Sequence, residues 1–134
     1  MTKSKYADIY NKVKAAMEQE KLFLQSEITM MQLSRIVGTN RVYLSKAINE
    51  GYGCGYSEML NRYRLDFLFR EAIYDKKNIE KLVTEYGFWS RTTFYDIFKI
   101  RFGTSPRRFM DEHDSRDIQR NILPTLAFPN QPRG

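Results

Sequence analysis

Two stretches of this sequence resemble each other, and their shared pattern decides the fold. The first is Leu33-Ser-Arg-Ile-Val-Gly38-Thr-Asn-Arg-Val-Tyr-Leu44-Ser-Lys-Ala-Ile48, and the second is Leu82-Val-Thr-Glu-Tyr-Gly87-Phe-Trp-Ser-Arg-Thr-Thr-Phe94-Tyr-Asp-Ile-Phe98. Each combines a short apolar-periodic segment, a glycine able to adopt the left-handed turn conformation, and a second segment with core residues four apart. Each stretch is therefore predicted to form a short helix, a tight turn and a second helix.

The rest of the chain is also predicted to be helical, because apolar residues recur at helical spacing and sustained strand-like alternation is absent. Thr29 and Gln32 have capping-box spacing, Asn40 and Ser90 are good N-caps, and Ser105-Pro106 places proline at a favoured first helical position. The expected helices span about residues 6–24, 29–37, 40–49, 56–74, 79–86 and 91–102, with a last short one from 106. Residues 51–55 are expected to form a glycine-rich loop. Three later prolines predict an extended tail after about Leu123.

The 56–74 helix is apolar nearly all round, so it must be covered on several sides. This pattern suits a rod that bridges two small lobes. We therefore predict an all-α protein of about seven or eight helices, in which two helix-turn-helix lobes are joined by a long central helix. The predicted boundaries are 1–28 for an N-terminal helix and connection, 29–110 for the double helix-turn-helix domain (lobes about 29–55 and 75–110, linker helix 56–74), and 111–134 for a polar C-terminal tail.

The charge of the chain fits a nucleic-acid partner. The 134 residues carry a formal net charge of +6, and a hydrophobic content of 42% is enough for a folded core and excludes global disorder. Between Arg91 and Arg108 five basic side chains stand against one acidic one. The second lobe therefore carries most of the excess positive charge.

The second helix of each stretch has one face for packing and one for a partner. At about 100° per residue, the inward sets are Leu44, Ala47 and Ile48 in the first copy, and Phe94, Ile97 and Phe98 in the second. The outward sets have the same internal spacing: Arg41, Val42, Ser45, Lys46 and Asn49 in the first copy, and Arg91, Thr92, Tyr95, Asp96 and Lys99 in the second. The second helix of such a unit can lie in the major groove, which predicts double-stranded DNA as the partner.

The stretch from about Leu33 to Phe109 resembles the DNA-binding domain of the AraC/XylS transcription regulators. The resemblance is carried by Tyr43-Leu44-Ser45-Lys46-Ala47-Ile48-Asn49, Arg64-Leu65, Gly87-Phe88, Phe94, Phe98-Lys99 and Gly103-Thr-Ser105-Pro106. Ser34 and Val83 depart from the family pattern at positions where helices pack closely. The resemblance implies a monomer that places both reading helices in successive major-groove segments on one face of DNA. It also implies transcription activation by contact with RNA polymerase.

The residues on and beside these outward sets divide by their chemistry into two roles. The base-reading set is Arg41, Val42, Ser45, Lys46, Arg91, Thr92, Tyr95 and Asp96. Arg91 can make bidentate hydrogen bonds to guanine, and Val42 can touch a thymine methyl group. Asp96 has two interpretations: it accepts a hydrogen bond from cytosine N4, or it orients Arg91 at the rim. The phosphate-contacting set is Asn40, Ser90, Thr93 and Lys99.

Other functional classes find little support in the sequence. Cys54 is the only cysteine, which fits a reducing compartment, and no apolar run approaches bilayer length, so we expect a cytoplasmic protein. Cys54 and His113 do not make a metal set, and residues 51–55 lack the Gly-Lys-Ser/Thr of a phosphate-binding loop. We therefore expect no metal, no cofactor and no enzymatic activity.

Two alternatives remain open at this point. A competing hypothesis is a protein-interaction module that kept the fold without DNA binding, favoured by Asp96 and by the uncharged Val42 and Ser45. The sensor or dimerisation domain of the family is missing from these residues. The chain is therefore either a small stand-alone regulator or, as we slightly favour, the output end of a longer sensor protein.

Overall fold

The computed structural model describes residues 4–72, 87–88 and 90–126, and throughout these ranges every regular element is helical. This confirms the predicted all-α class. In chain order the elements are α1 (Ala7–Glu18), the 3-10 turn η1 (Leu22–Leu24), α2 (Met30–Val37), α3 (Arg41–Tyr52), α4 (Tyr56–Ala72), α5 (Arg91–Phe102), α6 (Pro106–Glu112), α7 (Ser115–Asp117), the π-helical turn η4 (Ile118–Ile122) and α8 (Leu123–Leu126). The helix predicted at residues 79–86 lies outside the described residues.

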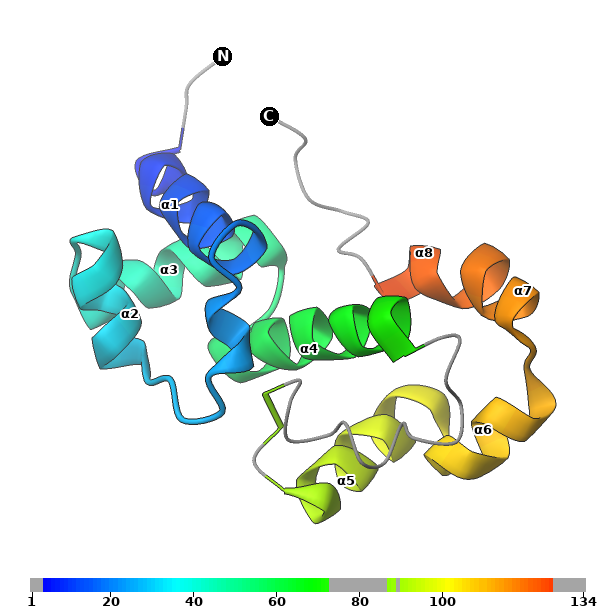
Figure 1. Ribbon diagram of the computed structural model, residues 1–134. Coiled ribbons are helices and arrows are strands. Elements are labelled where there is room, and N and C mark those ends of the chain that lie inside the picture. The colour runs from blue at the N-terminus through cyan, green and yellow to red at the C-terminus, as the bar shows by residue number, and fades with distance from the viewer. Residues whose placement is uncertain (1–3, 73–86, 89, 127–134) are drawn as a thin grey trace.

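Helix α4 is the centre of the molecule (Figure 1). Helices α1, α2 and α3 gather around its beginning, α5 lies below its second half in this view, α8 lies above its end, and α6 and α7 lie beyond that end (Figure 1). The buried residues form two clusters, one on each half of α4. The predicted pair of lobes on a long central helix is therefore confirmed. No helix in the described ranges is both long and apolar enough to cross a membrane.

The predicted caps begin and end the helices of the first lobe. The Thr29 side chain accepts a hydrogen bond from the Gln32 backbone N–H at 3.1 Å, while the Gln32 side chain accepts from the Thr29 backbone N–H at 2.9 Å. Helix α2 ends at Gly38, whose φ of +76° lies in the left-handed region. The Asn40 Oδ1 then accepts from the Tyr43 N–H at 2.8 Å and opens α3. Such local hydrogen bonds satisfy helix-end amides, which explains why short sequence motifs predicted these boundaries.

Helix α1 differs from the predicted 6–24 helix and belongs to the first lobe. It ends at Glu18, and Lys21 turns the chain with a φ of +53°. Its Val13 and Met17 are fully buried in the same cluster as the side chains of α2 and α3. Each such buried apolar side chain contributes about 1.5–3 kcal/mol. Helix α1 is therefore part of the core of the first lobe, whereas we had predicted a connecting helix; the domain boundaries themselves stay a prediction.

Helix α3 continues three residues beyond the predicted end and contains Gly51 and Tyr52. A Cβ at Gly51 would overlap the ring of Tyr10, which lies directly against α3. The Tyr10 and Tyr52 rings pack edge to face with centroids 5.1 Å apart. The glycine that suggested a loop instead allows α1 to approach the backbone of α3 closely.

The core of the second lobe is aromatic. Phe69 from α4 packs against Phe98 from α5 and Phe109 from α6, with ring centroids 5.9 and 5.7 Å away. Phe88, in the turn before α5, packs edge to face on Phe94 at 5.0 Å. All five rings are almost fully buried. Edge-to-face pairs of this kind add to the hydrophobic effect, so this cluster fixes α5 and α6 on α4.

The C-terminal segment is helical as far as Leu126, whereas we predicted an extended tail after about Leu123. Ile118 and Leu126 are buried in the core of the second lobe. The spacing of Ile118, Ile122 and Leu126 by four residues is helical, but Pro124 favoured an extended tail in the prediction. Pro124 is the second residue after the π-helical turn η4, and such a local irregularity lets a helix accommodate proline. The prediction of an extended tail after about Leu123 is therefore wrong for residues 123–126, and the boundary of a polar C-terminal tail at residue 111 stays a prediction.

Candidate nucleic-acid interface

Helix α3 divides into a buried and an exposed face as predicted. Leu44, Ala47 and Ile48 are fully buried. Arg41, Lys46 and Asn49 are exposed, Ser45 is half-buried, and Val42 is exposed by 60%. The Asn49 Nδ2 donates to the Ser45 carbonyl oxygen at 2.8 Å and approaches the Ser45 hydroxyl at 3.4 Å. The exposed face of α3 therefore combines two cations, an apolar side chain and an amide.

Helix α5 presents a similar face, with two differences from the prediction. Phe94 and Phe98 are fully buried, and Arg91, Thr92, Asp96 and Lys99 are exposed. Ile97, which we expected inside, is half-buried. Tyr95 is also half-buried, because its ring packs 5.9 Å from that of Phe94. Among the predicted reading residues of α5, Tyr95 is therefore the one held closest to the core.

The helix caps engage the side chains that we assigned to phosphate. The Ser90 Oγ accepts from the Thr93 N–H at 3.1 Å and donates to the Thr93 Oγ1 at 3.0 Å. The Asn40 side chain is bonded to its own helix in the same way. The backbone amides of the first turn remain the groups that a phosphate can reach at these helix starts. Lys99, in contrast, is exposed on the surface of α5.

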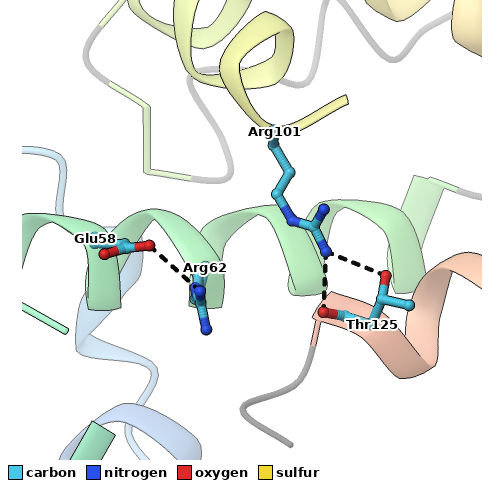
Figure 2. Close-up of polar contacts among 4 residues, drawn as sticks. All are labelled: Glu58, Arg62, Arg101 and Thr125. Carbon is cyan, nitrogen blue, oxygen red and sulfur yellow. Dashed lines mark hydrogen bonds and ion pairs between the residues drawn. The ribbon is translucent and has the colours of Figure 1, made fainter. Parts of the chain in front are cut away.

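Arg101 and Arg108 are both engaged by other residues of the second lobe. Arg101 Nη2 donates to the Thr125 carbonyl oxygen at 3.0 Å and to its Oγ1 at 3.2 Å, and Figure 2 shows the guanidinium reaching α8. Arg108 pairs with Glu112 at 3.1 Å on the surface of α6. Arg101 is therefore directed toward α8 and the charge of Arg108 is paired with Glu112, which leaves Arg91 and Lys99 as the cations of the outward face of α5.

Ile100 is a residue of this face that the sequence analysis did not assign. It is 87% exposed and lies between Lys99 and Arg101. At about 100° per residue, it lies roughly 40° around the helix from Asp96. The inward and outward sets were assigned only for positions 91–99, so neither set included this exposed apolar side chain.

Arg64 forms a junction between the lobes that was not predicted from the sequence. This side chain is only 7% exposed. Its Nε donates to the Phe23 carbonyl oxygen at 2.7 Å, and its Nη2 donates to the Gln25 carbonyl oxygen at 3.0 Å. Burial lowers the pKa of the Arg64 guanidinium, and the nearby Tyr56 phenol opposes this shift. The guanidinium thus ties α4 to the η1 turn of the first lobe.

Gly87 brings the turn of the second lobe to the same point. Its φ is +89°, and a Cβ there would overlap the Phe23 carbonyl oxygen and lie 2.9 Å from the Arg64 Nε. The turn that leads into α5 therefore packs on η1 and on the Arg64 side chain. The sequence contained one signal for this junction. Arg64 lies at helical spacing between Leu60 and Leu68, on an otherwise apolar stripe of the helix.

The described residues contain no group of three or more His, Cys, Asp or Glu side chains that could hold a metal ion. Two features define the class of protein. The first lobe contains the α2–turn–α3 unit, and in the second lobe the Gly87 turn leads into the capped helix α5. With their common helix α4, these make a protein with two helix-turn-helix units. A family model described as a helix-turn-helix domain matches residues 33–112. The chain belongs to this AraC-type helix-turn-helix family of DNA-binding transcription regulators.

Relatives and solved structures agree with this assignment. An uncharacterized HTH-type transcriptional regulator of Staphylococcus aureus strain N315 is 25% identical over 99 residues, which are 74% of this chain and 13% of that protein. The HTH-type transcriptional regulator AdiY of Escherichia coli K12 is 27% identical over 63 residues, 47% of this chain and 25% of AdiY. This chain therefore spans only a small part of the length of these relatives.

Two solved structures are similar in fold. The C-terminal domain of AraT, a response regulator from Geobacillus stearothermophilus, aligns with a TM-score of 0.69 at 22% identity, covering 83% of this chain and 90% of that one. A protein of unknown function from Listeria innocua aligns with a TM-score of 0.64 at 24% identity, covering 79% and 97%.

Proposed function

We propose that this chain binds double-stranded DNA sequence-specifically by placing α3 and α5 in two adjacent major-groove segments. One observation carries the proposal: two capped helices, held by separate cores on one central helix, expose equivalent faces that begin with Arg41 and Arg91. The major groove admits one helix per segment, and each base pair presents a distinct pattern of donors and acceptors there.

The reading roles follow from the chemistry of the exposed side chains. Arg41, Val42, Ser45 and Lys46 read the segment entered by α3, and Arg91, Thr92, Tyr95 and Asp96 read the one entered by α5. The half-buried Tyr95 is limited to a contact near the groove edge. Lys99 and Thr93, with the helix starts at Asn40 and Ser90, hold phosphates and set the register.

Selection of binding sites from random DNA, followed by mobility-shift titration of the selected site, tests this function. We expect a preferred site with two read segments. Each neutralised phosphate contributes about −0.9 to the log–log slope of affinity against salt, so several contacts predict a slope of roughly −4 or steeper. Selection that returns no preferred sequence, or affinity that barely changes between low and moderate salt, would contradict sequence-specific DNA binding.

A second candidate function is a protein-binding module, and Ile100 is the observation that favours it. An isoleucine that is 87% exposed on the presented face of α5 suits an apolar protein contact. The same titration separates the candidates, because a protein-binding module with this net charge would show at most non-specific binding, with no preference for a selected site over random DNA.

Roles that extend beyond this chain follow from the family and stay proposals. We infer that the chain activates transcription by contact with RNA polymerase and works in the cytoplasm without enzymatic activity. A sensor domain preceding it in a longer protein would supply the signal. A reporter assay with the full regulator, compared with this segment alone, measures both the direction of regulation and the need for a sensor.

A further inference from the structure

The beginning of α1 lies beside the presented face of α3. The Tyr6 and Tyr43 ring centroids are 5.8 Å apart. The Lys5 Nζ is 5.4 Å from the Tyr6 centroid and 5.5 Å from the Tyr43 centroid. The Lys46 Nζ approaches the same Tyr6 ring at 6.0 Å. We call Lys5, Tyr6, Tyr43 and Lys46 the Lys5–Tyr6 flank.

This flank adjoins the reading face of α3 along one side. At about 100° per residue, Lys46 lies roughly 40° around α3 from Val42, and Tyr43 lies roughly 60° further in the same direction. Lys46 is therefore the border between the reading face and the flank. Tyr43 is 42% exposed, so the flank opens to solvent beside α3.

The flank is a concentration of positive charge that its own ring contacts do not neutralise. Two ammonium groups lie within cation–π distance of one tyrosine ring. Neither Lys5 nor Lys46 forms an ion pair with any residue in the described ranges. The rings also limit the freedom of Lys5, which lowers the entropy lost when it binds an anion.

A DNA phosphate is the anion that this position fits. A helix in the major groove, which is about 12 Å wide, is bordered by sugar–phosphate backbones on both sides. The side of α3 that carries Tyr43 and Lys46 faces one of those borders when Val42 faces the bases. A lysine ammonium binds phosphate as a point charge, and a tyrosine hydroxyl can donate a hydrogen bond to it.

We propose that the Lys5–Tyr6 flank binds a backbone phosphate at the edge of the groove segment entered by α3, with Lys5 as its principal cation. This inference rests on the proposed DNA-binding function. It extends the interface to residues that precede the matched family segment of residues 33–112.

Salt-dependent titrations of Lys5→Ala and Lys12→Ala, both on the full 134-residue chain, test the proposal. Lys12 is also exposed, but it lines a groove between α1 and α2 with Gln19 and Ile36. Both variants lose one positive charge. We expect Lys5→Ala to make the log–log slope of affinity against salt less steep by about 0.9. The affinity at 0.1 M salt should fall by roughly eightfold, equally for all sequences. Lys12→Ala should leave the slope unchanged, and Lys5→Arg should restore it.

The outcomes distinguish this inference from the function on which it rests. Equal slopes for Lys5→Ala and Lys12→Ala, with specific binding by the wild type, would overturn the flank and leave the function standing. A changed site preference in Lys5→Ala would also overturn it, because a phosphate contact carries no sequence information. A wild-type chain that binds no DNA would overturn the function itself.

Discussion

Replacing Arg64 by Met should destabilise the protein far more than its position on a linker helix suggests. The wild-type guanidinium is 7% exposed and donates to two backbone carbonyls at 2.7 and 3.0 Å. Hydrogen bonds to charged groups contribute about 1.5–3 kcal/mol each, and burial of the cation offsets part of this gain. Methionine retains much of the packing of the stem but leaves the Phe23 and Gln25 carbonyls without this donor. We expect a loss of about 2–4 kcal/mol in the free energy of unfolding.

Urea denaturation followed by far-UV circular dichroism measures this loss. Arg62→Met is the matched control, because Arg62 lies on the same helix and its partner Glu58, at 3.3 Å, is on the surface (Figure 2). Solvent screens such a pair, so the control should lose no more than about 0.5 kcal/mol. Equal losses for the two variants would refute the argument that the buried guanidinium holds η1 on α4. Arg64→Lys should lie nearer to Met than to wild type, since one ammonium does not reproduce the planar fork.

Three further predictions concern α5 and the DNA. Arg91→Ala should cost on the order of 1–3 kcal/mol at the preferred site and relax one base position, whereas Lys99→Ala should weaken all sequences about equally; an unchanged site logo for the Arg91 variant would contradict these roles. Ser90→Ala should lower the free energy of unfolding by about 1 kcal/mol through loss of the α5 cap, and a thermal denaturation curve identical to wild type would exclude that contribution. One monomer should cover an asymmetric site with segments roughly 34 Å apart, and inserting ~5 base pairs between them should abolish joint protection in footprinting; protection only by dimers on a palindrome would contradict the monomer.

The parts of the fold that sequence predicted best are those fixed by neighbouring residues. The capping box at Thr29, the cap at Ser90 and the left-handed Gly38 depend on contacts within four residues, so their motifs could be read directly. The buried faces of α3 and α5 followed from helical periodicity in the same way.

The parts that sequence missed depend on contacts between distant segments. Arg64 meets carbonyls about forty residues earlier in the chain, at separations of 41 and 39 residues. Arg101 meets Thr125, 24 residues later, so a residue that the sequence analysis counted only as part of the basic excess links α5 to α8. Nothing in the local pattern of Arg101 distinguishes it from a solvated arginine. The apolar stripe around Arg64 indicates burial, but it does not identify the distant carbonyls that Arg64 meets. The cluster of Lys5 with Tyr43 is hidden for the same reason.

The central helix explains how these distant contacts fix the distance between the two reading helices. On α4, Met59 and Leu60 are buried in the first core, and Leu65, Leu68 and Phe69 are buried in the second. Leu60 and Leu65 are only five residues apart, about 7.5 Å along the helix axis, and Arg64 lies between them. Helix α4 contains no Gly or Pro at which it would bend easily. Because both lobes hold a single stiff segment on adjacent turns, α3 and α5 cannot separate without breaking one core. The spacing that we propose for the two DNA segments therefore follows from the packing around this short stretch of α4.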